Sequence, residues 1–153
     1  MPIQSAGILL YRKAGSKMQV FLVHPGGPFF KNKDLGAWSI PKGEFLDDED
    51  ALAAAKREFE EETGKAIGGD FFELKPVRLK SGKTVHAWAI EGDINHETIT
   101  SNLFEMEWPP KSGKKQSFPE IDRAGWFEID EAKLKINAAQ VGFIVELTMI
   151  HEI

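Results

Sequence analysis

The sequence predicts one α+β domain, and three observations lead to that prediction. Short apolar runs with β-favouring residues occur in both halves of the chain. Between them, residues 48–63 are rich in Ala and Glu and place their apolar residues at helical spacing. The length of 153 residues suits one domain with its own core, and no repeat or linker divides the chain. We therefore expect residues 1–153 to form a single domain.

The N-terminal part of the chain predicts a hairpin followed by a short strand. Residues 3–12 and 18–24 are two apolar runs that flank the turn signal Ala14-Gly15-Ser16. Residues 37–40 predict a brief strand that ends at Pro41, because proline cannot donate a backbone hydrogen bond.

A helix is expected next, in the most acidic part of the chain. Asp47 or Asp48 is expected to cap its start, with further acids in the first turn, where the helix dipole favours negative charge. The helix is expected to run to about Thr63. Gly64 follows at the place where a helix commonly ends in the left-handed conformation.

The second half of the chain alternates predicted strands with less regular segments. The strands are expected at residues 71–79, 84–91 and 125–129. Residues 92–119 show no clear period, and an irregular stretch of that length is often a functional loop. Asp130 is expected to cap a short helix, and residues 138–150 carry an apolar face at helical spacing that closes the domain.

Composition excludes several classes of function. The net charge of −5 argues against a general nucleic-acid binder, although a local basic patch can still contact phosphates. The chain has no cysteine, which rules out disulfides and thiolate chemistry and fits the cytoplasm. No apolar run reaches the length of a membrane span, and the N-terminus does not resemble a signal peptide. We expect a cytoplasmic protein that does not interact with membranes.

Three glutamates of the predicted helix share one face. Glu58, Glu61 and Glu62 fall within an arc of roughly 100°, whereas Glu60 points to the opposite side. Like charges at this spacing repel one another, so a bound cation would offset the cost. An all-oxygen ligand set suits Mg²⁺ or Mn²⁺ rather than zinc. The alternative explanation of this face is a solvated acidic surface.

The spacing around these glutamates follows a longer pattern. It reads Gly, five residues, Glu, seven residues, Arg-Glu-Phe, one residue, Glu-Glu, one residue, Gly. The chain thereby resembles the Nudix hydrolase family, with matches at Gly43, Glu49, Arg57, Glu58, Phe59, Glu61, Glu62 and Gly64. Lys65 departs from the aliphatic residue that the family usually has there. The resemblance implies an α/β/α sandwich around a central mixed sheet. It also implies hydrolysis of a nucleoside diphosphate linked to another group.

The resemblance also implies roles for the matching residues. Glu58, Glu61 and Glu62 would hold Mg²⁺ or Mn²⁺, with the Gly43 carbonyl as a further ligand. Such a metal offsets phosphate charge and lowers the pKa of an attacking water. Arg57 is expected to pair with a carboxylate, either Glu61 or Glu49.

The catalytic base stays open between two positions. In some members of the family it is a glutamate of the helix, here Glu58 or Glu61; in others it lies on a later loop. Glu120 lies six residues before Trp126, a spacing that resembles the late glutamate of dinucleoside polyphosphate hydrolases.

The substrate is indicated more weakly than the reaction. Lys42 precedes Gly43 in a Pro-Lys-Gly sequence that resembles the diadenosine polyphosphate and diphosphoinositol branches of the family. It is expected to neutralise a phosphate oxygen. Trp108 and Lys114 bring to the irregular loop an aromatic ring and a charge suited to a base and phosphates. A small nucleotide is the expected substrate, with a dinucleoside polyphosphate as the first choice. The alternatives are a (d)NTP, an ADP-ribose-type substrate, or a catalytically silent nucleotide-binding module. The sequence does not reveal the oligomeric state.

Overall fold

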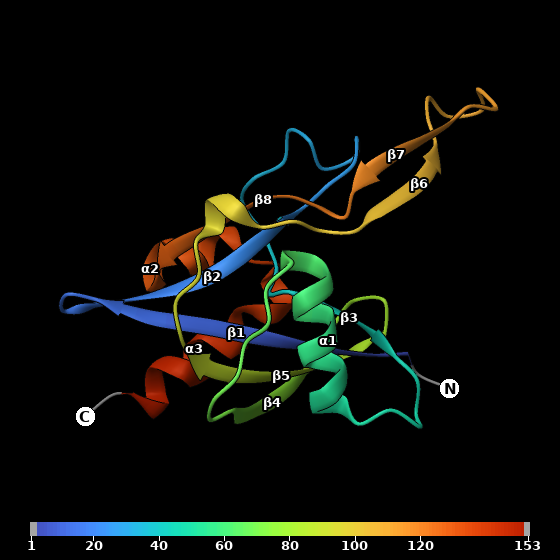
Figure 1. Cartoon of the computed structure of the whole chain (residues 1–153). Helices are drawn as coiled ribbons and strands as arrows, with labels where there is room; N and C mark the ends of the chain where they lie inside the picture. The colour runs from blue at the N-terminus through green and yellow to red at the C-terminus, as the bar shows by residue number, and fades with distance from the viewer. Residues whose placement is uncertain (1–2, 152–153) are drawn as a thin grey trace.

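A mixed sheet forms the centre of the molecule, in a computed structural model that describes residues 3–151 (Figure 1). Its strands lie in the order β4-β5-β1-β2-β8, and β3 also pairs with β1. The bounds are β1 Gln4–Ala14, β2 Lys17–Pro25, β3 Lys42–Phe45, β4 Phe72–Arg78, β5 Thr84–Glu91 and β8 Ile121–Glu128. β1 pairs in parallel with β5 and antiparallel with β2 and β3. The expected α+β class is confirmed.

Helices cover both faces of this sheet (Figure 1). α1 (Ala51–Thr63) packs on one face, where Ala55 and Phe59 are fully buried. α2 (Ile129–Lys135) and α3 (Val141–Ile150) pack on the other face. Two buried apolar clusters, one on each side of the sheet, therefore confirm the α/β/α sandwich. No helix within residues 3–151 is long and apolar enough to cross a membrane.

The segment before β3 lies between two diverging strands. β2 pairs with β1 only from Tyr11 onward, and Ser39 instead exchanges two backbone hydrogen bonds with Val23 of β2. On the other side the Ile8 amide donates to the carbonyl of Pro41. The expected strand 37–40 is thus reduced to isolated bridges. The regular strand β3 begins after Pro41, in a sequence whose Gly and charged residues are weak strand formers.

The irregular segment 92–119 contains regular structure that its sequence did not reveal. It forms the 3₁₀ turn η1 (His96–Thr98) and the two-stranded hairpin of β6 (Leu103–Glu107) and β7 (Lys115–Pro119). The hairpin projects away from the central sheet (Figure 1). Both strands are only five residues long and mostly exposed, and β7 lacks the apolar alternation by which a half-buried strand is recognised.

The start of α1 differs from the expectation, whereas its end agrees. The N-cap is Asp50, whose side chain accepts from the Ala53 amide at 3.0 Å, and not Asp47 or Asp48. The acids expected in the first turn therefore precede the helix. Gly64 ends α1 with a φ of 75°, as the sequence predicts.

Two later boundaries also shift. β8 begins at Ile121 rather than at residue 125, because it pairs with β2 over almost its whole length. Asp130 lies inside α2, whose cap position is Glu128 and has no side-chain cap bond, so Asp130 is not the predicted cap. A second 3₁₀ turn, η2 (Ala138–Gln140), precedes α3.

We expect Asp50→Ala to lower the free energy of unfolding by about 1 kcal/mol, because it removes the cap of α1. Asp48→Ala is the matched control, since the Asp48 side chain makes no hydrogen bond within residues 3–151. Urea unfolding of the two variants gives the comparison. Equal losses in both would contradict the assignment of Asp50 as the cap.

Candidate functional site

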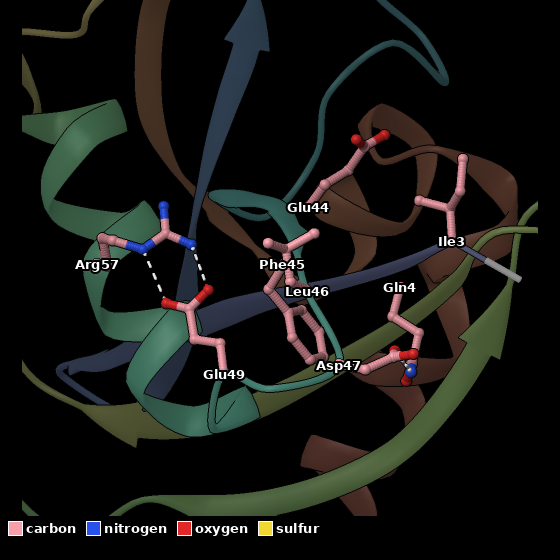
Figure 2. A pocket seen from close by; sticks show the side chains of 8 residues that line it. All are labelled: Ile3, Gln4, Glu44, Phe45, Leu46, Asp47, Glu49 and Arg57. Carbon is pink, nitrogen blue, oxygen red and sulfur yellow. Dashed lines mark hydrogen bonds and ion pairs between the residues drawn. The ribbon is translucent and has the colours of Figure 1, made fainter. Parts of the chain in front are cut away.

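Arg57 of α1 organises the acidic face. Its Nε and Nη2 atoms donate to the two carboxylate oxygens of Glu49, each at 3.0 Å, and Figure 2 shows this two-point contact between the helix and the loop before it. Its Nη1 atom donates to Glu58 at 2.8 Å and lies 3.5 Å from Glu61. Arg57 therefore pairs with both of the expected partners, Glu49 and Glu61, and with Glu58 as well.

These contacts place the positive charge of Arg57 among the negatively charged glutamates of the acidic face. The hydrogen bonds that Arg57 donates to Glu49 and Glu58 raise the pKa of its guanidinium, although burial opposes the shift. The pKa of Glu58 is raised, first by burial and then by the charge of Glu61, while Arg57 opposes the rise. One guanidinium thus offsets only part of the repulsion among the acids.

Glu62 is the most perturbed acid of the site. Burial raises its pKa to about 8, although the backbone amide and the charge of Lys42 both act to lower it. That amide donates to Oε1 of Glu62 at 3.2 Å. α1 and β3 are therefore joined at this carboxylate.

Gly43 stands where β3 passes closest to α1. A Cβ added at this position would overlap the carboxylate of Glu58, so any other residue would force that carboxylate to move. Glu58 itself is only 9% exposed, which shows how tightly strand and helix enclose it.

Glu120 is brought to the helix by a backbone link that the sequence did not reveal. The Asn102 amide donates to the Glu61 carbonyl at 3.2 Å, and the Asn102 carbonyl accepts from the Glu120 amide at 2.8 Å. Ser101 supports the same link, because its Oγ accepts from the Ile121 amide at 3.1 Å. The pKa of Glu120 is raised by burial and then by the charge of Glu61, so the two carboxylates lie within reach of each other.

A cleft of about 240 Å³ opens beside these acids. Its lining includes Lys42, Glu62 and Glu120, and also Phe30, Trp38 and Asn137. Burial lowers the pKa of the Lys42 ammonium, and the nearby Lys83 adds to that effect, while Glu62 opposes it. The cleft therefore combines a cation and two acids with aromatic and other neutral side chains.

A second cavity is larger but lacks this chemistry. It measures about 470 Å³ and lies beside the Arg57–Glu49 pair, between β3 and the start of α1 (Figure 2). None of Glu58, Glu61, Glu62 and Glu120 lines it. Because reacting groups decide a site more than volume does, we assign the smaller cleft as the candidate site.

The structure places the other predicted residues, Trp108 and Lys114, away from this cleft. Both lie beyond the β6–β7 pairing, at the far end of the hairpin. The Trp108 ring packs edge-on against Phe29, with ring centroids 5.5 Å apart, and Lys114 is exposed. Sequence reasoning missed Trp38 and Asn137, and the only sign of Trp38 was its place just before Pro-Lys-Gly.

The ligand atoms that this site offers are of the type that a hard divalent cation prefers. They are carboxylates, and burial and mutual repulsion raise the pKa of Glu58, Glu62 and Glu120. Within residues 3–151 no three acidic or imidazole side chains are already arranged as a ligand set. Arg57 holds Glu58, and Glu62 accepts from Lys42, so a cation would have to reorient these carboxylates.

Comparison with known proteins gives a consistent result. A family model described as the NUDIX domain matches residues 1–147. The Ap4A hydrolase of C. elegans, in a binary complex, is 22% identical with a TM-score of 0.61, and the match covers 97% of this chain and 96% of that one. The NUDIX domain of Shewanella oneidensis NrtR, complexed with ADP ribose, is 15% identical with a TM-score of 0.63, covering 99% and 88%. A mutT/nudix family protein from Listeria innocua is 18% identical with a TM-score of 0.64, covering 99% and 96%. No curated protein matches the chain.

The raised pKa of Glu62 predicts a pH dependence of stability. The folded chain keeps this carboxyl protonated up to a pKa of about 8, whereas the unfolded chain releases the proton near 4.5. The stabilisation is complete at acid pH and is lost as the pH rises through the folded pKa. In chelating buffer, Glu62→Gln should therefore gain at least about 1 kcal/mol over the wild type between about pH 5 and pH 9.

Urea unfolding across this pH range measures the effect. Glu60→Gln is the control, because Glu60 is an exposed glutamate of the same helix. The perturbation assigned to Glu62 is wrong if both variants follow the wild type in parallel at every pH.

Proposed function

The chain belongs to the NUDIX family, and on that premise we propose that it is a metal-dependent pyrophosphohydrolase acting on a nucleoside-diphosphate-linked substrate. One observation carries the proposal. Glu62 of α1 and the distant Glu120 line a single cleft with Lys42, and the charge of Glu61 acts on Glu120. The chain is then a hydrolase of phosphorus-containing anhydrides, with residues 1–153 as one catalytic domain.

We propose that Glu58, Glu61 and Glu62 hold Mg²⁺ or Mn²⁺, with the Gly43 carbonyl as a further ligand. A bound divalent cation would offset phosphate charge and lower the pKa of an attacking water. Arg57 supports this arrangement by fixing the rotamers of Glu58 and Glu49. The close approach at Gly43 supports it too, because that backbone lies against the Glu58 carboxylate.

The proton of the attacking water needs an acceptor. Glu120 is one candidate, because burial and the charge of Glu61 raise its pKa towards the range where a carboxylate is an effective base. Glu61 and Glu58 are the other candidates. The short backbone link through Asn102 favours Glu120, since it fixes this residue relative to the end of α1.

For the substrate we propose a dinucleoside polyphosphate. Lys42 supports this choice, because its ammonium lies among the acids where several phosphates would have to be neutralised. The likeness to an Ap4A hydrolase points the same way. Trp108 and Lys114 would then contact a distant part of an extended substrate, outside the cleft. A (d)NTP or an ADP-ribose-type substrate is the alternative, and the likeness to a domain complexed with ADP ribose favours the latter. A catalytically silent binding module is the alternative of a different class.

Glu61→Gln tests the reaction. We expect it to lower kcat by about 10²-fold or more with Mg²⁺, because it removes a charged oxygen from the proposed metal site. Glu60→Gln, an exposed neighbour, should retain wild-type turnover. The assay uses diadenosine tetraphosphate, dATP and ADP-ribose with identification of every product. Unchanged hydrolysis in Glu61→Gln would remove this residue from the metal site, and a wild type inactive on any anhydride would favour the silent module.

Lys42→Ala tests the choice of substrate. Removal of this charge should raise KM for diadenosine tetraphosphate by about tenfold and for ADP-ribose by no more than about twofold, because the longer chain carries more phosphate charge. Lys80→Ala, which removes an exposed lysine, is the control. Equal losses on both substrates would show that Lys42 does not discriminate chain length.

A further inference from the structure

A buried histidine bridges two segments of the chain that contribute residues to the cleft. His24 lies near the end of β2, and its side chain is fully inaccessible to solvent. Its Nδ1 atom is 2.8 Å from a carboxylate oxygen of Asp122, and its Nε2 atom is 2.6 Å from the carbonyl oxygen of Lys33. The ring also packs edge-on against Trp38, which lines the cleft. A polar group buried so completely is costly unless its hydrogen bonds are made.

The two partners of His24 belong to different parts of the chain. Lys33 lies in the loop 26–36, which also carries Phe30 of the cleft wall. Asp122 follows Glu120 by two residues in the segment that opens β8. The two parts meet a second time where the Gly26 amide donates to the Glu120 carbonyl at 2.8 Å. Gly26 has no room for a side chain there, because a Cβ would overlap the Pro119 carbonyl.

Arg123 strengthens the same junction from β8. Its Nη2 atom lies 3.4 Å from the Lys33 carbonyl and 3.2 Å from Nε2 of His24, and its guanidinium stacks over Trp38. The imidazole is nevertheless the only side chain within residues 3–151 that reaches both Lys33 and the Asp122 carboxylate with close hydrogen-bond distances. The two ring nitrogens of an imidazole point to opposite sides, and in the imidazolium form both of them donate, so this side chain can bridge a carbonyl and a carboxylate on two segments.

We propose that His24 is a positioning residue that sets the separation of two segments beside the cleft, the loop 26–36 and the start of β8. Its contact with Lys33 holds the loop that carries Phe30, and its contact with Asp122 holds the segment that carries Glu120. The first contact governs how the substrate is bound, and the second governs where the acid acts. This inference rests on the proposed function for its kinetic part, whereas the structural coupling stands without it.

Two substitutions of His24 separate the two contacts. The amide nitrogen of asparagine falls near the position of Nδ1, and that of glutamine falls near Nε2. His24→Asn should keep the bond to Asp122 and lose Lys33, which raises KM at least about fivefold and changes kcat less than about twofold. His24→Gln should keep Lys33 and lose Asp122, which lowers kcat at least about fivefold with a smaller effect on KM. A residue that serves only folding would not divide its effects in this way.

Amide hydrogen exchange of the free protein tests the coupling without substrate or metal. His24→Asn should speed exchange of the Lys33 amide, which donates to Phe30, by about tenfold. His24→Gln should instead speed exchange of the Gly26 amide, which donates to Glu120, by a similar factor. His86→Gln is the control, because His86 of β5 bonds to Gln4 and lies outside the cleft. It should change neither amide.

Asp122→Ala provides a second route if the His24 variants do not fold, because this side chain is 31% exposed. It should reproduce the kcat loss and the faster Gly26 exchange expected of His24→Gln. The inference is overturned if folded variants leave both amides and both kinetic constants within about twofold of the wild type, or change them equally. A further outcome is a wild type that hydrolyses none of the three substrates while the variants still show the expected faster amide exchange. That combination would uphold the coupling through His24 and refute only the proposed function.

Discussion

Arg57 is shared among three carboxylates, and the acidic site depends on that sharing. α1 places Glu58 and Glu61 on one face, and Glu49 approaches from the loop before the helix. Without a cation these charges would repel one another and push the helix away from β3. The guanidinium is planar and has several donors, so it can hold Glu49 at two points and still contact Glu58. A lysine could not make this set of contacts.

The site also requires Glu120, about sixty residues further along the chain, to lie beside the acids of α1. The carbonyls at the end of α1 meet this requirement, since the last turn of a helix leaves such groups without partners inside the helix. The Thr63 carbonyl accepts from Thr100, and the Glu61 carbonyl accepts from Asn102. The same segment then binds Glu120 through its own carbonyl. The end of the helix therefore serves as the attachment point for a loop that is distant in sequence.

The features that the sequence predicted well are those that local chemistry decides. The end of α1 at Gly64 follows from the freedom of glycine, and the acidic face follows from helical spacing. The cap failed because Asp47, Asp48 and Asp50 each satisfy the local rule, and the folded chain uses Asp50. The hairpin β6–β7 and the partners of Glu120 also escaped prediction, because they depend on backbone hydrogen bonds that any residue can make.

The parting of β1 and β2 has a consequence for how such a cleft can change. Along one edge of β1, the N-terminal half pairs with β3 and the C-terminal half pairs with β2. The chain from Trp38 to Pro41 fills the gap where β1 and β2 separate. The cleft opens along this split, so its dimensions are set by where strands separate and by the length of chain between them. Point substitutions along its walls can alter the contacts that it offers. A markedly larger ligand would call for residues to be inserted or removed between β2 and β3.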